Sequence, residues 1–181
     1  LSEALDLAAV DDSAKVVIIT GAGGRAFVAG ADISAMQNMS AVEAYDYARL
    51  GQTTYNKVQD LPKIVIAAID GFALGGGGEL ALACDIRVAS AKSQIGIPEV
   101  TLGVFPGFAG TQRLPRLVGT GIAKEMLVPH FITWPPIFFG HKFLKAIESS
   151  KDSCTYFCTE SPSFGYIGTI SKGALVKYQL G

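Results

Sequence analysis

The sequence predicts an α/β fold with a largely parallel sheet. Two continuous apolar, β-branched runs, residues 15–20 (KVVIIT) and 64–69 (IVIAAI), are typical of buried strands. Between them, residues 40–59 have helix-forming composition and begin with the capping-box spacing of Ser40 and Glu43. A strand, a helix and a strand in this order predict a right-handed crossover that joins two parallel strands of one sheet.

Further elements are predicted from local composition and from capping signals. Residues 27–33 are small and predict a turn by composition alone. Residues 1–10 have the apolar spacing of the second half of a helix, so we expect the natural chain to start before Leu1. The remaining elements are a helix over 79–83 after the glycine run 75–78, a strand over 85–89, a helix opened by Pro106 and Gly107, and a helix with Thr120 as its N-cap.

Composition excludes several classes of function. With 181 residues, 49% of them hydrophobic and 17% charged, the chain can bury a substantial core. A net charge of −1 gives no basic field for nucleic acid, and the longest apolar stretch, residues 63–83, is interrupted by Asp70 and Glu79, which argues against a membrane span. Three cysteines favour a reducing compartment, so we expect the bacterial cytoplasm or the mitochondrial matrix.

The pattern changes near Met126. More than half of the aromatic residues lie in residues 127–181, where no helical or strand period is evident. We therefore expect a core over residues 1–126 and an atypical C-terminal segment over 127–181.

The glycine run before Glu79 is the first candidate for chemistry. It places several backbone N–H groups at a helix start, where they have no intrahelical partner and can stabilise an oxyanion. The alternative is a plain tight turn. Glu79 and Glu99 each lie among apolar neighbours, so burial is expected to raise their pKa values into a range that suits proton transfer. Taken singly, each acid is also compatible with a solvated loop.

Three linked segments resemble the crotonase, or enoyl-CoA hydratase/isomerase, family. They are residues 19–36 (ITGAGGRAFVAGADISAM), 63–90 (KIVIAAIDGFALGGGGELALACDIRVAS) and 95–119 (IGIPEVTLGVFPGFAGTQRLPRLVG). The resemblance covers about residues 1–126 and implies a crotonase-like ββα spiral of repeated strand-helix units. Two departures are mild: Ala109 replaces a glycine of the usual PGFGG or PGAGG, and Ile97 replaces the usual glutamine or leucine.

The resemblance implies a role for each matching residue. The N–H groups of Ala31 and Gly76 match the oxyanion-hole donors, Glu79 matches the carboxylate that activates water, and Glu99 matches the one that exchanges a proton with the α-carbon. Ala29, Asp32 and Ile33 match the wall that receives coenzyme A. The full set expected to bind substrate is Ala29, Ala31, Asp32, Ile33, Leu74, Gly75, Gly76, Pro98 and Glu99.

The implied activity is reversible hydration of a trans-2-enoyl-CoA to a 3-hydroxyacyl-CoA, in fatty acid or butyrate metabolism. Both acids are present, which favours a hydratase over the family's isomerases. No metal and no cofactor are expected, because coenzyme A is part of the substrate. The partners expected are an acyl-CoA thioester and further copies of the chain, in a homotrimer or a dimer of trimers.

Several alternatives stay open. Gly21, Gly23 and Ala26 fit a loose dinucleotide-binding pattern, although extended sequence rather than a long helix follows them. A metal site could be formed by His130, His141, Cys154 and Cys158, but their spacing matches no recognised zinc motif. The chain could also be an isomerase, another acyl-CoA enzyme of the family, or a truncated relative that binds acyl-CoA without turnover.

Overall fold

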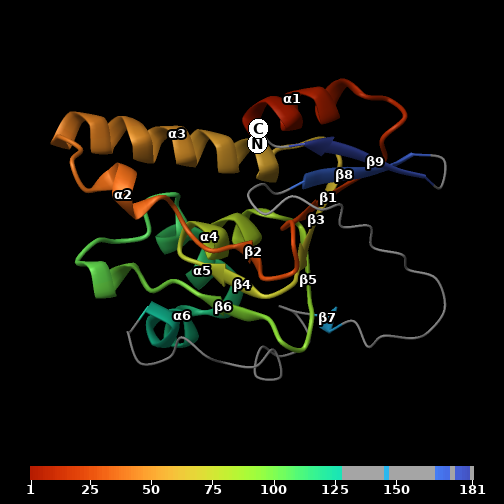
Figure 1. The fold of residues 1–181 in the computed structure, drawn as a ribbon. Coiled ribbons are helices and arrows are strands. Elements are labelled where there is room, and N and C mark those ends of the chain that lie inside the picture. The colour runs from red at the N-terminus through yellow and green to blue at the C-terminus, as the bar shows by residue number, and fades with distance from the viewer. Residues whose placement is uncertain (128–144, 147–165, 172–173, 180–181) are drawn as a thin grey trace.

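A computed structural model describes residues 1–127, 145–146, 166–171 and 174–179. Pairs of consecutive strands alternate with helices along most of this length (Figure 1). The helices are α1 (Ser2–Val10), α2 (Ile33–Met36), α3 (Ala41–Gln59), α4 (Gly76–Ala83), α5 (Gly110–Val118) and α6 (Thr120–Leu127), with a 3₁₀ turn at Glu99–Leu102. The strands are β1 (Val16–Thr20), β2 (Ala26–Val28), β3 (Ile64–Ile69), β4 (Phe72–Leu74), β5 (Ile86–Ala89), β6 (Gln94–Gly96), β7 (Lys145–Ala146), β8 (Tyr166–Ser171) and β9 (Ala174–Gln179).

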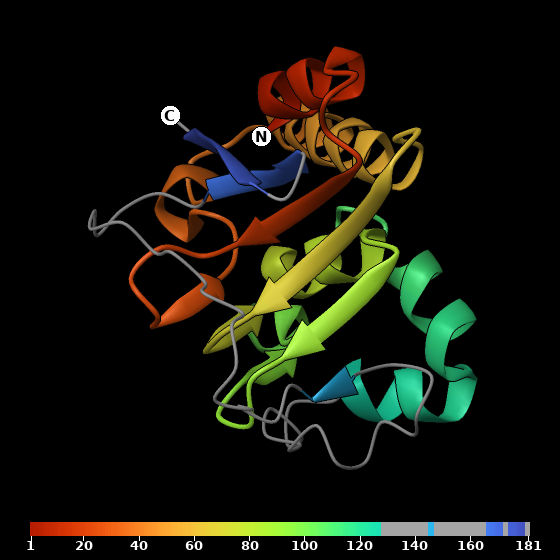
Figure 2. The same cartoon turned by 90° about the vertical axis from the view of Figure 1, so that its right-hand side faces the viewer.

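The larger sheet has the strand order β7-β5-β3-β1-β8-β9. Strands β1, β3 and β5 are parallel neighbours, with Val16 beside Ile64 and Ile66 beside Ile86. Figure 2 shows these three strands side by side, with the β8-β9 pair next to β1. The prediction of a largely parallel sheet, with α3 as the crossover between β1 and β3, is therefore confirmed.

A smaller parallel sheet, β2-β4-β6, was not predicted. Residues 27 and 28, taken as part of a turn, belong to β2, and β4 occupies the residues before the glycine run. Each of these strands is only three residues long, which is too short to show an alternating pattern. Their pairing with one another, rather than their own propensity, makes them strands.

Helix α4 is the centre of the packing, because every one of its eight residues is buried. It contacts α3, α5, β2 and β4. A Cβ on Gly77 would lie 1.9 Å from the carbonyl oxygen of Val28, and one on Gly78 would lie 2.8 Å from that of Gly96. The glycine run therefore lets the helix approach the backbones of β2 and β6, and it is more than a tight turn.

One of the predicted helix boundaries is confirmed and two need correction. The capping box at Ser40 and Glu43 is present as expected. Helix α5 begins at Gly110 rather than at Pro106, because Ala109 adopts a left-handed conformation with φ of 75° and interrupts the backbone before it. Thr120 is the first residue of α6 rather than its N-cap, since the carbonyl of Gly119 accepts the hydrogen bond from Ala123.

The segment after Met126 contributes strands that its sequence did not predict. Strand β8 pairs antiparallel with β1, and β9 pairs with β8. The division into a core over residues 1–126 and a separate C-terminal segment stays a prediction. No helix within the described residues is both long enough and apolar enough to cross a membrane.

The packing of α4 predicts the effect of adding a methyl group. Gly77→Ala should lower the free energy of unfolding by about 1–3 kcal/mol, because the new Cβ overlaps the Val28 carbonyl and forces backbone to move. Gly121→Ala is the matched control: it meets open space in α6 and should raise stability by about 0.4–1 kcal/mol. Urea unfolding of both variants measures the difference. Equal stability of the two would contradict the close packing of α4.

Candidate active site

Glu79 lies in the first turn of α4, and only 2% of its surface is exposed. Its Oε1 atom accepts hydrogen bonds from the backbone N–H groups of Phe108, at 3.0 Å, and Gly110, at 2.7 Å. Both donors bind the same oxygen. A carboxyl group in this interior is therefore held in a fixed orientation, with hydrogen bonds that compensate part of the cost of burial.

The surroundings raise the pKa of Glu79 to about 7. Desolvation by burial is the largest cause, and the negative charge of Glu99 adds to it. The hydrogen bonds from Gly110 and Phe108 and the positive charge of Arg113 act in the opposite direction. A carboxyl group that titrates near neutrality can both accept and donate a proton at physiological pH.

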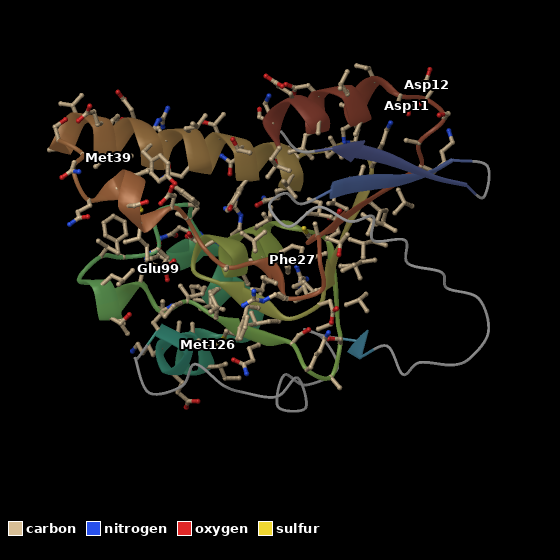
Figure 3. The ribbon with its side chains drawn as sticks, in the orientation of Figure 1. Asp11, Asp12, Phe27, Met39, Glu99 and Met126 are labelled. Atoms are coloured by element: carbon tan, nitrogen blue, oxygen red, sulfur yellow. The ribbon has the colours of Figure 1, made fainter. Side chains whose placement is uncertain are left out.

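Glu99 begins the 3₁₀ turn and is half-buried. Burial raises the pKa of its carboxyl group, and its Oε2 atom is buried without a hydrogen-bond partner among the described residues. A Cβ on Gly75 would lie 3.1 Å from Oε1 of Glu99, so this carboxyl group lies against the N-terminus of α4. Figure 3 labels Glu99, which in that view lies between α2 and α6.

Two backbone donors lie beside these acids. Gly76 is the first residue of α4, and a Cβ on it would lie 3.7 Å from the nitrogen of Ala31, so the two N–H groups are neighbours. Neither donates a hydrogen bond within the described part of the chain. The carbonyl of Gly76 accepts a hydrogen bond of 2.8 Å from the hydroxyl of Tyr55, which fixes the start of the helix.

The remaining residues expected to bind substrate surround this centre. Ala29 is exposed on the segment between β2 and α2, and Ile33 is exposed at the first position of α2. Asp32 has a structural task, because its Oδ1 accepts from the N–H groups of Ser34, at 2.9 Å, and Ala35, at 3.3 Å, and so caps α2. Leu74 ends β4, and Pro98 precedes the 3₁₀ turn.

The residues that hold Glu79 were missed by sequence reasoning. The donors at Phe108 and Gly110 lie on either side of Ala109, whose positive φ of 75° is the only one at a non-glycine residue within the described ranges. This conformation costs an alanine about 1–2 kcal/mol and explains why a glycine is usual there. The sequence carried a signal for this turn, because the glycine that is usual at position 109 indicates a left-handed backbone there.

A family comparison fits this arrangement. The family model described as enoyl-CoA hydratase/isomerase matches residues 1–129. The chain belongs to the enoyl-CoA hydratase/isomerase family. The crotonase-like α/β fold predicted from the sequence is thereby confirmed.

Individual relatives agree. Over 117 residues, or 65% of this chain, it is 56% identical to a crotonyl-CoA hydratase of Syntrophomonas wolfei and 53% identical to a short-chain-enoyl-CoA hydratase of Clostridium acetobutylicum. A crystal structure of an enoyl-CoA hydratase from Bacillus anthracis matches 70% of this chain and 49% of its own, with a TM-score of 0.67 and 46% identity. The chain spans 45% of the length of both curated relatives, so it matches about half of each.

The alternative sites find little support in this family member. Residues 21–26 lead into strand β2 rather than a long helix, which is the wrong context for dinucleotide binding. No three His, Cys, Asp or Glu residues gather into a possible metal site within the described ranges. His130, His141, Cys154 and Cys158 lie outside the described residues.

The raised pKa of Glu79 predicts a pH-dependent stability. Its pKa of about 7 in the folded state exceeds the ordinary value of 4.5, so the neutral form stabilises the fold, and this contribution is lost as pH rises from about 4.5 through 7. At about 1.4 kcal/mol per unit, the unfolding free energy should fall by roughly 3 kcal/mol relative to Glu79→Gln over this range. Denaturant unfolding of both proteins at pH 5 and pH 8 measures it. If the unfolding free energies of the two proteins changed equally between pH 5 and pH 8, the raised pKa of Glu79 would be contradicted.

Proposed function

We propose that the protein from which this chain derives adds water reversibly across the double bond of a trans-2-enoyl-CoA. One observation carries the proposal: two carboxyl groups with raised pKa values, Glu79 and Glu99, lie at a helix start beside the neighbouring N–H groups of Ala31 and Gly76. Hydration of a conjugated thioester needs a base for water, an acid for the α-carbon and donors for the carbonyl oxygen.

The oxyanion step uses the backbone donors. The thioester oxygen accepts hydrogen bonds from Ala31 and Gly76 and gains negative charge as the enolate forms. These donors are fixed before the reaction by α4 and by the segment after β2, so no reorganisation accompanies the charge development. One donor of this kind typically contributes about 2.7–4 kcal/mol to lowering the barrier.

The two acids complete the addition. Ionised Glu79 takes a proton from water, whose oxygen forms the bond to the β-carbon, and neutral Glu99 gives its proton to the α-carbon. Because the negative charge of Glu99 raises the pKa of Glu79, protonation of Glu99 favours the ionised form of Glu79 that the reaction requires. A positioned acid or base typically contributes about 10²–10⁴ in rate.

The substrate proposal includes the coenzyme A portion. The segment with Ala29, Asp32 and Ile33 receives it, with Leu74, Gly75 and Pro98 near the thioester. A short acyl chain is supported by the names of two relatives, a crotonyl-CoA hydratase and a short-chain-enoyl-CoA hydratase. We further propose that the reaction needs no cofactor or metal and that the protein forms a homotrimer or a dimer of trimers. Its proposed location is the bacterial cytoplasm or the mitochondrial matrix.

Two other functions compete. An isomerase of the same family would move a proton within the acyl chain, and the presence of both acids favours the hydratase over it. The other alternative is a protein of the same family that binds acyl-CoA without turnover. Analysis of the product separates all three. A hydratase adds water to crotonyl-CoA, an isomerase moves the double bond at constant mass, and a binding protein retains butyryl-CoA without converting crotonyl-CoA.

The proposed roles predict that Glu79→Gln and Glu99→Gln each lower kcat for crotonyl-CoA hydration by at least about 10². Binding of butyryl-CoA should be largely preserved, because neither amide removes a donor to the thioester. Stopped-flow absorbance gives the rate and calorimetry gives the affinity.

Glu125→Gln, on the exposed side of α6, is the control and should leave both quantities unchanged. Turnover within a few-fold of the unsubstituted protein would remove that acid from the mechanism.

A further inference from the structure

We propose that Arg113 is a positioning residue for Glu79. Its guanidinium group ties the turn that donates to Glu79 onto helix α3 and thereby sets the orientation of the Glu79 carboxyl group. The proposal rests on the role of Glu79 in the proposed hydration, and it concerns a residue that neither touches the reacting atoms nor belongs to the predicted site.

Each of the three nitrogen atoms of the Arg113 guanidinium group donates a hydrogen bond. Arg113 lies in α5 and is 9% exposed. Its Nη1 donates to the carbonyl of Phe108 at 2.8 Å, its Nη2 to Oδ1 of Asn56 at 2.6 Å, and its Nε to Oε1 of Gln59 at 3.0 Å. Three acceptors on two segments fix the plane of the group, an arrangement that the ammonium of lysine cannot reproduce.

Phe108 connects this guanidinium group to the carboxyl group. Its carbonyl accepts from Arg113, and its N–H donates to Oε1 of Glu79 at 3.0 Å. Both peptide groups of one residue are thus fixed, one by the arginine and one by the acid. The second donor, Gly110, lies two residues further along, and a Cβ on it would lie 2.7 Å from Oε1 of Glu79, so a small shift of this turn changes the geometry at Glu79.

Helix α3 supplies the rigid support. Besides Asn56 and Gln59, it carries Gln52, whose Nε2 donates to the carbonyl of Gly107 at 2.8 Å. The ring of Tyr55 packs edge-on against that of Phe108, with centroids 5.4 Å apart. Nineteen residues of continuous helix therefore hold the turn from one side while Glu79 holds it from the other.

The charges around Glu79 give the proposal a second consequence. Among the described residues, Glu99 raises the pKa of Glu79 and Arg113 lowers it, while Arg113 itself faces Glu79, Asp60 and Tyr55. Loss of the Arg113 charge should therefore raise the pKa of Glu79 further and reduce the ionised fraction that can accept a proton from water. A merely structural arginine would not move this titration.

The experiment compares four forms of the 181-residue chain: unsubstituted, Arg113→Gln, Arg113→Lys and Arg116→Gln. Arg116 is the matched control, since it lies on the same helix but is exposed and donates to Gln112 within that helix. The titration of Glu79 is followed by carbon-13 NMR of labelled glutamate carboxyl groups, assigned with Glu79→Gln. Hydration of crotonyl-CoA gives kcat and KM as functions of pH.

For Arg113→Gln we expect the Glu79 midpoint to rise and the acid limb of kcat to move with it, because a positive charge beside the carboxyl group is lost. At the optimum, kcat should fall about 10- to 100-fold with little change in KM, because the base is misplaced while substrate contacts remain. Arg113→Lys should keep the midpoint but lose kcat, and Arg116→Gln should change neither.

An unchanged Glu79 midpoint in Arg113→Gln, or a kcat equal to that of Arg116→Gln, would overturn the proposal. If Arg113→Gln does not fold, the double variant Asn56→Ala with Gln59→Ala replaces it, because it removes two of the three acceptors of Arg113. Its kcat should fall, by less than the 10- to 100-fold expected for Arg113→Gln. Full activity of this double variant would also overturn the proposal. The NMR midpoint requires no turnover. The Glu79 midpoint could therefore shift in Arg113→Gln even if the unsubstituted chain did not hydrate crotonyl-CoA. That result would contradict the proposed function but not the coupling of Arg113 to Glu79.

Discussion

The contact between the glycines of α4 and the backbones of β2 and β6 is the constraint on which the site depends. A Cβ on Gly77 would lie 1.9 Å from the Val28 carbonyl, a distance that only a glycine allows. This approach brings the first N–H of α4 beside the N–H of Ala31 and points Glu79 into the interior. The helix start, the paired donors and the buried acid are consequences of the same close packing.

The same constraint explains where the structure stores unfavourable energy. Glu79 is buried with two hydrogen bonds to one oxygen, Glu99 has a buried oxygen without a partner in the described part of the chain, and Ala109 has a positive φ. Each feature costs free energy, and all three lie at the start of α4 or at the turn that holds Glu79. Unfavourable features that are concentrated in one place are typical of functional sites, where the rest of the fold compensates their cost in free energy.

The sequence predicted the parts of the site that depend on local pattern. Continuous apolar runs gave β1 and β3, the spacing of Ser40 and Glu43 gave the start of α3, and the family motifs pointed to Glu79 and Glu99. The second sheet was missed because strands of three residues show no period. The three hydrogen bonds of the Arg113 guanidinium were missed because two of its three acceptors, Asn56 and Gln59, are more than fifty residues away along the chain, and only the folded structure brings them together.

The central claim is that Ala31 and Gly76 hold the oxygen of a thioester. Isotope-edited infrared spectroscopy tests it directly, with hexadienoyl-CoA carrying carbon-13 at its carbonyl and bound to the 181-residue chain. Hydrogen bonds from both donors should polarise the carbonyl and move its stretching band to lower frequency than in water. Gly76→Ala keeps the N–H and should retain the shift, whereas Gly76→Pro, which replaces the N–H with a ring carbon at a position where helices accept proline, should lose much of it. A band at its aqueous frequency in the bound, unsubstituted protein would contradict the account.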